Sequence, residues 1–287
     1  MISIFDEYIL WLQNKGKMES TIKSYIKIIE RFKKWYLESY DREFDGKFLP
    51  LHIRNYRSYL MTVKKLNAKT INNNLSAIKS YCDFLVEKGI IETNPVLDDY
   101  FIDVQDQGVS PAKLENRDFN KLEEAVVHFG TARDIAIFYT LAYTGIRVSE
   151  LCNIRLNDIV KDELVIYYGK GGKQRKIPLN RTVKESIDNW LKERDRYKYS
   201  YLDYLFISER GKLNRSTVYK MINEYCYLAK IDPIGPHQLR HYFCKRALEK
   251  GFTITEVAAL AGHSRITTTQ IYINPSMQEL KEKIERL

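Results

Sequence analysis

A helical pattern runs through most of the chain and is interrupted by a segment of a different period, Glu163-Leu-Val-Ile-Tyr-Tyr-Gly-Lys-Gly-Gly-Lys-Gln-Arg-Lys-Ile-Pro-Leu179. Two short β-type runs, 163–168 and 175–179, lie on either side of a glycine-rich turn. This pattern predicts a hairpin or small sheet, to which 204–207 adds a candidate strand. We therefore expect a mainly α fold with a small antiparallel β-sheet.

Apolar residues recur at helical spacing on both sides of this stretch. After residue 115, the helical segments are 118–129, 132–143, 181–195, 214–229, 237–250, 253–261, 265–273 and an amphipathic 276–287. Before residue 100, four segments with short links predict a small bundle: 4–12, 20–37, 51–63 and 70–88. Ser20 is the expected N-cap of the second segment, and Gly89 the expected end of the fourth.

Residues 101–115 show no sustained period and contain Ser110-Pro111, which is typical of a linker. The expected organisation is a helical domain over 1–100, a linker over 101–115 and a second domain over 116–287.

The net charge of +9 is unevenly distributed. Residues 1–112 hold 16 Lys and Arg against 15 Asp and Glu, so nearly all of the excess lies in residues 113–287. A basic second domain fits a polyanion partner, most simply DNA or RNA, although solvated charged faces would give the same composition. The four cysteines are far apart, which fits a reducing cytosol. We find no signal peptide and no apolar run that could span a membrane.

Six residues form a candidate catalytic set, in this order along the chain: Arg147, Lys170, His237, Arg240, His263 and Tyr272. Arginine binds phosphate through two parallel hydrogen bonds, and imidazole can exchange a proton with a nucleophile. His237 and Arg240 are three residues apart, so a helix places them on one side. A phenol becomes a nucleophile only where a base or nearby cations favour its phenolate.

Other interpretations exist for each of these residues. His237 and His241 could bind zinc, but the metalloprotease pattern needs Glu where Gln238 stands. The segment 169–173 is similar to a phosphate-binding P-loop, but Gln174 replaces the required Ser or Thr. Taken singly, a tyrosine such as Tyr272 is most often a packing residue. No metal and no nucleotide cofactor is therefore expected.

Taken together, five segments resemble the tyrosine recombinases, and most closely the Xer and phage or transposon integrase branch. The matching segments are Thr144-Gly-Ile-Arg-Val-Ser-Glu-Leu151, 169–178, His237-Gln-Leu-Arg-His241, Leu260-Ala-Gly-His263 and Thr268-Thr-Gln-Ile-Tyr272. In the first domain, Ser20-Thr-Ile-Lys-Ser-Tyr25 and 70–95 look like the core-binding domain of that family. The resemblance covers nearly the whole chain and contains all six catalytic residue types in order.

The resemblance implies an enzyme that breaks and rejoins DNA through a 3′-phosphotyrosyl link, without metal or ATP. Tyr272 would attack the phosphate, while Arg147 and Arg240 would bind its non-bridging oxygens. His263 would donate a further hydrogen bond to that phosphate. His237 would take the proton from the tyrosine.

Lys170 would protonate the leaving 5′-oxygen, with Lys173 as its nearest competitor. Glu150 would orient the site from behind Arg147. The candidate DNA contacts are Lys69, Thr70, Asn73 and Lys79 in the first domain, and Arg155, Arg175 and Lys176 in the second.

The implied partner is double-stranded DNA with an inverted-repeat core site, bound by a homotetramer across two sites in the cytoplasm, in association with the nucleoid. The segment 276–287 would dock on a neighbouring protomer, or else pack on its own domain. Accessory proteins could set the direction of exchange. With no arm-binding domain ahead of residue 1, dimer resolution, inversion and small-element integration are all open. The alternative functions are a type IB topoisomerase and a non-catalytic DNA-binding relative.

Overall fold

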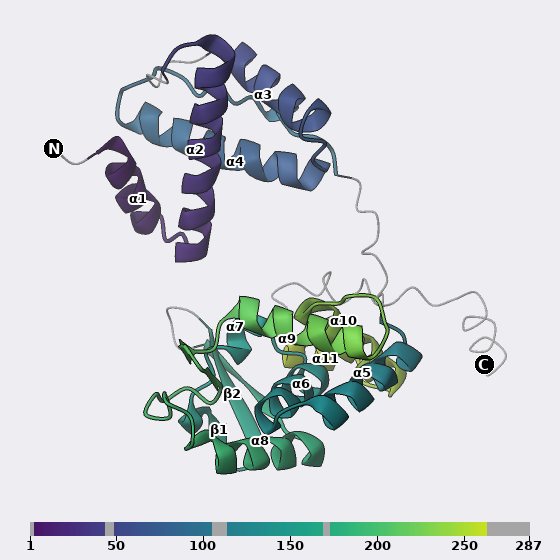
Figure 1. Ribbon diagram of the computed structural model, residues 1–287. Coiled ribbons are helices and arrows are strands. Elements are labelled where there is room, and N and C mark those ends of the chain that lie inside the picture. Colours follow the sequence, from purple (N-terminus) through teal and green to yellow (C-terminus); the bar gives the residue numbers. More distant parts are fainter. Residues whose placement is uncertain (1–2, 44–48, 105–113, 169–172, 263–287) are drawn as a thin grey trace. The chain divides into compact units, whose positions relative to one another are not determined.

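The computed structural model describes residues 3–43, 49–104, 114–168 and 173–262 (Figure 1). The chain divides into two compact units, Met1–Gln107 and Gly108–Leu287, which we call unit 1 and unit 2. None of the helices in the described ranges is long and apolar enough to cross a membrane.

The described residues of unit 1 form a bundle of four α-helices, which confirms the helical prediction for this part of the chain (Figure 1). They are α1 (Ile4–Asn14), α2 (Glu19–Tyr40), α3 (Pro50–Thr62) and α4 (Ala68–Glu87), followed by a short 3₁₀ turn, η1 (Asp98–Tyr100). The two long helices, α2 and α4, pack together and carry the core.

The core of unit 1 has two parts, because α2 and α4 each contact a different neighbour at either end. Toward the start of α2, Tyr8 and Leu12 of α1 pack with Ile29 and Phe84. Toward its end, α3 joins a second cluster that includes Phe32 and other buried aromatic rings. Because these apolar residues recur at helical spacing, the sequence alone predicts the helices that form the bundle.

Ser20 is not the N-cap of α2, and that prediction was wrong. The helix begins at Glu19, and the N-cap position is held by Met18, whose side chain makes no capping hydrogen bond. Glu19 instead forms an ion pair with Lys23 one turn later, and an acidic residue in the first turn is favoured by the helix dipole. A capping preference is worth only about 1 kcal/mol, which such contacts can outweigh.

Unit 2 is also mostly helical, with two small antiparallel sheets in its described part. Its helices are α5 (Asn116–Phe129), α6 (Ala132–Thr144), α7 (Val148–Leu151), α8 (Arg181–Arg194), α9 (Arg215–Leu228), α10 (Pro236–Glu249) and α11 (Ile254–Ala261), with the 3₁₀ turn η2 (Leu156–Asp158). The strands are β1 (Ile159–Val160), β2 (Glu163–Tyr168), β3 (Lys173–Pro178), β4 (Ile207–Ser208) and β5 (Gly211–Lys212). The predicted fold class is confirmed.

The predicted hairpin is present as strands β2 and β3, which pair antiparallel from Glu163 with Pro178 to Tyr168 with Lys173. Strand β1 adds a third, short strand on the other side of β2. The residues that join β2 to β3, 169–172, lie outside the described residues, and Lys170 is among them.

The strand predicted at 204–207 is displaced. Only Ile207 of that run belongs to a strand, β4, while Tyr204 makes a single isolated bridge. Within this run, Nη2 of Arg194 donates to the carbonyl oxygen of Tyr204 at 2.8 Å, and its Nε donates to that of Leu205 at 3.3 Å. Because a buried guanidinium takes these carbonyl groups, they are not available for a strand ladder.

Helix α6 is central to unit 2, since both α8 and α10 pack against it. It ends at Gly145, whose φ of 63° lies in the left-handed region. A Cβ at this position would lie 2.2 Å from Cδ1 of Phe243 on α10. Gly145 is therefore needed both for the helix end and for the close approach of α10.

The predicted helices at 265–273 and 276–287 lie outside the described residues, as do His263 and Tyr272.

Candidate active site

Three of the six predicted catalytic residues, Arg147, His237 and Arg240, lie in the described part of the chain. They come from two places that are far apart in sequence: the start of α7, just after α6 ends, and the first turns of α10. Since α10 packs on α6, the fold brings these places together.

Arg147 precedes α7 in an extended conformation, as a residue at the N-cap position does. Its backbone N–H donates to Oε2 of Glu150 at 2.8 Å, and its Nη1 donates to Oε1 at 3.1 Å. Its Nη2 donates to the carbonyl oxygen of Gly262 at 2.9 Å, at the end of α11. The guanidinium is thus oriented by two protein partners, while its side chain remains 43% exposed.

Arg240 is buried on α10, and its Nη1 donates to the carbonyl oxygen of Gly145 at 2.7 Å. This bond ties α10 to the turn that leads directly to Arg147. Burial and then the nearby charge of Arg147 lower the pKa of the Arg240 guanidinium, which still stays protonated because arginine does not lose its proton in proteins. Two fixed cations therefore lie close to one another.

His237 lies in the first turn of α10, one turn before Arg240, and Pro236 provides the favourable start of that helix. Desolvation, and then the charges of Arg240 and Arg147, lower the pKa of the His237 imidazole. Its ring centroid is 4.1 Å from that of His241, whose pKa is lowered to about 4 mainly by burial. Both rings are neutral at pH 7, so His237 can accept a proton.

Glu150 lies between two arginines. Nη1 and Nη2 of Arg175 donate to its two carboxylate oxygens at 3.0 and 2.7 Å, in addition to the bonds from Arg147. Burial would raise the pKa of the Glu150 carboxyl, but the bonds and charges of Arg175 and Arg147 outweigh this and lower it. Glu150 is therefore ionised and fixed, as expected of a residue that orients Arg147. The contact between Glu150 and Arg175 was not predicted from the sequence.

The arrangement suits a phosphodiester. Two guanidinium groups can bind its non-bridging oxygens and stabilise charge in a pentavalent transition state, and a neutral imidazole beside them can take a proton. The remaining predicted members, Lys170, His263 and Tyr272, lie outside the described residues. Lys173, the predicted competitor of Lys170, is the first residue of β3.

Comparison with known proteins identifies the family. The model of the phage integrase family matches residues 113–279, and that of the phage integrase N-terminal SAM-like domain matches residues 4–91. This chain belongs to the phage integrase family, the tyrosine recombinases. The prediction of a site-specific DNA recombinase is confirmed.

The similarity to relatives extends over nearly the full length of this chain. A TnP I resolvase of Bacillus thuringiensis is 39% identical over 290 residues, covering 100% of both chains. A tyrosine recombinase XerA of Pyrococcus furiosus is 33% identical, covering 99% of this chain and 93% of the relative. A crystal structure of a lambda integrase dimer bound to a COC′ core site shares the fold, with a TM-score of 0.73, 20% identity, and coverage of 96% of this chain and 95% of that one.

The predicted DNA contacts of unit 2 have different surroundings. Arg155 is largely exposed, 3.5 Å from a carboxylate oxygen of Asp203, and its guanidinium lies over the ring of Tyr204. Lys176 is also exposed, and its Nζ is 2.9 Å from Oε2 of Glu163. Arg175 is nearly buried. Two of the three can therefore reach a ligand from the surface without leaving a buried partner.

The predicted DNA contacts of unit 1 lie along α4. Lys69 and Asn73 are exposed, and Thr70 is half-buried in the first turn, where its backbone N–H donates to the cap, Asn67. Lys79 forms an ion pair with Asp98, which brings it over the ring of Phe101. The predicted residues thus share one helix but not one environment.

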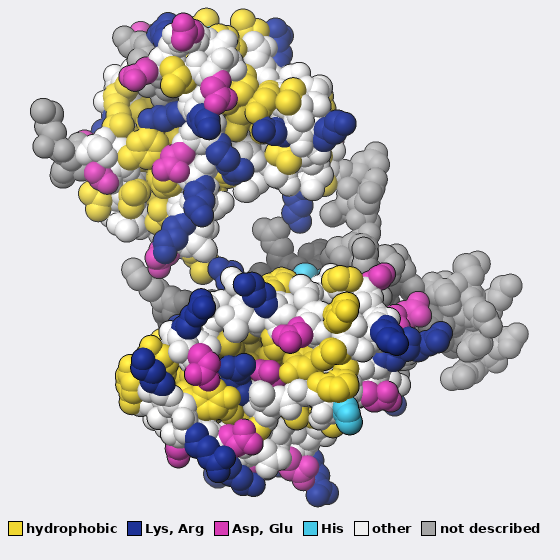
Figure 2. Space-filling model, in the orientation of Figure 1, with side chains coloured by type: hydrophobic (Ala, Val, Ile, Leu, Met, Phe, Trp, Pro, Cys, Tyr) yellow, Lys and Arg dark blue, Asp and Glu magenta, His cyan; other side chains and the backbone are white. Residues whose placement is uncertain are grey.

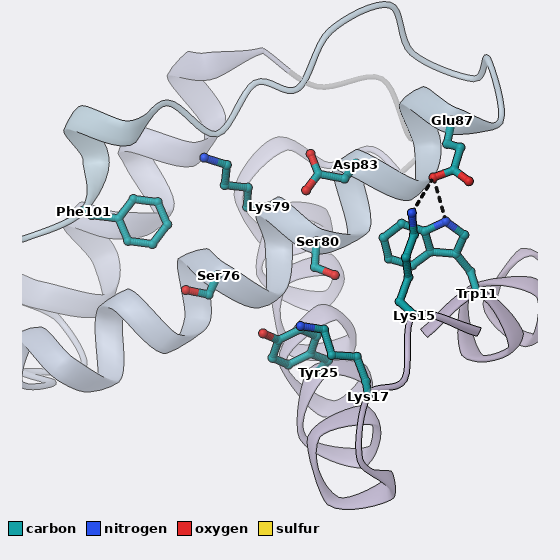
Figure 3. A pocket seen from close by; sticks show the side chains of 10 residues that line it. All are labelled: Trp11, Lys15, Lys17, Tyr25, Ser76, Lys79, Ser80, Asp83, Glu87 and Phe101. Carbon is teal, nitrogen blue, oxygen red and sulfur yellow. Dashed lines mark hydrogen bonds and ion pairs between the residues drawn. The ribbon is translucent and has the colours of Figure 1, made fainter. Parts of the chain in front are cut away.

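A pocket of about 550 Å³ adjoins Lys79 in unit 1 (Figure 3). Its lining residues come from α1, α2, α4 and the segments that follow α1 and η1: Trp11, Lys15, Lys17, Tyr25, Ser76, Lys79, Ser80, Asp83, Glu87 and Phe101. Ser76 and Ser80, which are half-buried, follow the exposed Asn73 along α4 at helical spacing. Sequence reasoning missed these residues, although the spacing of 73, 76 and 80 was readable.

The acids of this pocket are already paired. Glu87 accepts a hydrogen bond from the indole N–H of Trp11 at 2.9 Å and lies 3.5 Å from Nζ of Lys15 (Figure 3). Asp83 accepts a bond from the side-chain amide of Asn94 at 2.6 Å. On the visible face of unit 1, Lys and Arg side chains lie across the middle and continue toward the lower edge, with a few acidic side chains among them (Figure 2). The near-neutral composition of unit 1 thus hides an uneven surface.

Proposed function

We propose that this site-specific tyrosine recombinase cuts DNA with Tyr272 and exchanges strands between two target sites. The observation that carries the residue assignment is the convergence of Arg147 and Arg240 with the neutral imidazole of His237. A phosphate bound by two guanidinium groups needs no metal ion to offset its charge.

In the proposed cleavage step, the phenolic oxygen of Tyr272 attacks the phosphorus and its proton passes to His237. The bond from phosphorus to the 5′-oxygen breaks, and Lys170 supplies the proton that leaves with the 5′-hydroxyl. His263 donates a hydrogen bond to the same phosphate. The energy of the phosphodiester is kept in the tyrosyl ester, so a 5′-hydroxyl from a second site can reverse the step and join a new strand.

Unit 1 is proposed to bind the DNA backbone beside the cleavage site. The row of Asn73, Ser76 and Ser80 on α4 and the adjoining pocket offer hydroxyl, amide and ammonium groups, which are the donors that phosphate oxygens accept. Lys17, Ser76 and Ser80 join the predicted contacts on this surface. Arg155 and Lys176 are the proposed contacts of unit 2.

We propose resolution as the task of this enzyme, meaning the separation of two directly repeated sites in one DNA molecule. The supporting observation is the 39% identity to a resolvase over the whole of both chains. Four protomers on two inverted-repeat sites, linked through 276–287, are the proposed assembly. Its proposed location is the cytoplasm, with the nucleoid DNA, where accessory proteins would set the direction of exchange.

The test begins by mapping the site. The protein is incubated with a DNA fragment that contains its gene and flanking sequence, and covalent complexes that survive detergent are isolated and sequenced. Two direct copies of the mapped site are then placed in a plasmid. A recombinase for resolution converts this plasmid into two circles. Relaxation of a supercoiled plasmid that lacks the site would favour a topoisomerase, and binding without strand breakage would favour a non-catalytic relative.

A further inference from the structure

Arg175 stands at the point where three parts of unit 2 meet. It belongs to β3, the strand that leaves the hairpin, and its side chain is only 9% exposed. Its Nη1 and Nη2 donate to the carboxylate of Glu150 on α7, and its Nε donates to the carbonyl oxygen of Leu260 on α11 at 2.8 Å. One guanidinium thus fastens a strand to two helices.

Each of these partners also belongs to the surroundings of Arg147. Glu150 accepts bonds from the backbone and side chain of Arg147, and Gly262, two residues after Leu260, accepts one from its Nη2. The two arginines therefore hold the same carboxylate and the same helix end. Cations are favoured beside the carbonyl groups at a helix C-terminus, which makes the α11 contacts stable.

The charges of Glu150, Arg147 and Arg175 indicate what Arg175 contributes to the surroundings of Arg147. Glu150 carries one negative charge, and its pKa is lowered by both arginines although burial opposes this. Together the three side chains carry a net charge of +1. Without the Arg175 cation, Glu150 and Arg147 would form a neutral pair. The carboxylate would also be free to take two parallel bonds from Arg147, which would turn its N–H groups away from a phosphate.

We propose that Arg175 is a positioning residue for strand cleavage: by binding Glu150 and the end of α11, it keeps the guanidinium of Arg147 oriented and available to the scissile phosphate. This inference rests on the proposed function, and it gives Arg175 a role other than the direct DNA contact that the sequence predicts. A DNA contact would act on affinity, whereas a positioning residue acts on the rate of the chemical step.

The test measures single-turnover cleavage at saturating DNA. The probe is a duplex that carries the mapped site with a nick beside the cleavage position, so that the short 5′-hydroxyl fragment diffuses away and the covalent complex accumulates. The variants are Arg175→Ala, which removes cation and fork, and Arg175→Lys, which keeps the charge without the fork. Affinity and its salt dependence are measured on an intact duplex, and thermal unfolding reports stability.

Arg175→Ala is expected to slow cleavage on the order of 10- to 100-fold, less than the roughly 10²- to 10³-fold loss when a direct transition-state donor is removed. Arg175→Lys is expected to give an intermediate rate. DNA affinity should stay within about threefold, and the salt slope should be unchanged, because no phosphate contact is lost.

Arg133→Ala is the matched control for simple loss of a partly buried ion pair. Arg133 donates from Nε and Nη2 to Asp134 at 3.0 and 2.9 Å, and the two side chains are 17% and 10% exposed. This pair lies at the start of α6, about 18 Å along the helix from Gly145. The control should lose stability while keeping the cleavage rate of the wild type.

A cycle with Glu150→Gln shows whether Arg175 acts through Glu150. If it does, the double variant cleaves about as slowly as the slower single variant. Independent losses that multiply would overturn the proposal. So would a wild-type rate in Arg175→Ala, or a drop in affinity and salt slope without a drop in rate. Failure of the proposed function is recognised separately, because the wild type would then form no covalent complex.

Discussion

The guanidinium of Arg240 is held from inside the protein, and this determines what it can do in a reaction. It is bound to the carbonyl oxygen of Gly145, and both its burial and the charge of Arg147 disfavour its cationic form. An incoming phosphate relieves this repulsion between like charges. The site therefore gains more from the doubly negative pentavalent transition state than from the singly negative phosphodiester, as phosphoryl-transfer catalysis requires.

The titration of His237 is expected to determine how the cleavage rate falls at acidic pH. Its lowered pKa keeps the imidazole neutral, and thus able to accept a proton, at pH values below the ordinary pKa near 6.5. Single-turnover cleavage should hold its rate down to about pH 6.5 and fall only as the pH drops further and the ring is protonated. His237→Gln should slow cleavage on the order of 100-fold and remove this acid limb. An acid limb that persists in the variant would assign the proton acceptor elsewhere.

Residue types and their order were readable from the sequence, but the partners of each residue were not. The spacing of His237 and Arg240 requires only a helix, so it could be predicted. The bond from Arg175 to Glu150 joins residues that are 25 positions apart. The alternation of residues along β3 does not show which face of the sheet Arg175 lies on, because β2 has buried residues on both faces. A basic residue in a basic domain was therefore assigned to DNA.

Among the elements, the end of α6 controls the geometry of the site. Gly145→Ala would place a side chain in the left-handed region and against Phe243, at a cost of about 2–4 kcal/mol in the free energy of unfolding. Since Gly145 accepts the bond from Arg240, cleavage should also slow. Chemical denaturation and single-turnover cleavage measure the two effects.

Combining Gly145→Ala with Phe243→Leu provides the control, because it relieves the clash but not the backbone strain. The double variant should recover part of the lost stability. A double variant no more stable than Gly145→Ala would show that the contact with Phe243 contributes little.

Helix α4 carries the prediction for DNA binding by unit 1. Changing both Lys69 and Lys79 to Gln should weaken binding similarly on all DNA sequences and reduce the slope of log affinity against log salt by about two units. Titrations of a duplex at several salt concentrations measure this slope. The ion pair of Lys79 with Asp98 must open for such a contact, so Asp98→Asn should leave the slope unchanged or raise it. An unaltered slope in the lysine variant would remove α4 from the interface.

Elements with long, regular apolar spacing were predictable, while short ones were not. Helices α2 and α4 follow from periodicity because one face of each is buried over many turns. The single turn of α7 is too short to show a period, although it carries Glu150. The strand expected at 204–207 is displaced, and the carbonyl groups of Tyr204 and Leu205 bind the side chain of Arg194, a contact that local propensity does not include.

We propose that the two units of the molecule have different roles: unit 1 binds DNA, and unit 2 cleaves and rejoins it. The positive excess of unit 2 agrees with a phosphate-binding site in that unit, whereas unit 1 is nearly neutral in composition. Each unit has its own buried core, so a change in one core should leave the other intact.

Assembly is tested by deleting residues 276–287. If this segment links protomers, the shortened protein should still form the covalent complex on a single nicked site, because Tyr272 is retained. It should no longer join two sites, which native gel electrophoresis of labelled duplexes would detect. Normal pairing of two sites by the shortened protein would contradict the proposed role of the segment.

We propose that Tyr272 becomes covalently bound to a DNA 3′-phosphate without the aid of a metal. The most direct measurement incubates the wild type and Tyr272→Phe with the nicked duplex in EDTA, followed by denaturing electrophoresis and peptide mass spectrometry of the adduct. We expect a wild-type adduct on the peptide that contains Tyr272, and DNA binding without an adduct in Tyr272→Phe. An adduct formed by Tyr272→Phe, or one mapped to another residue, would contradict it.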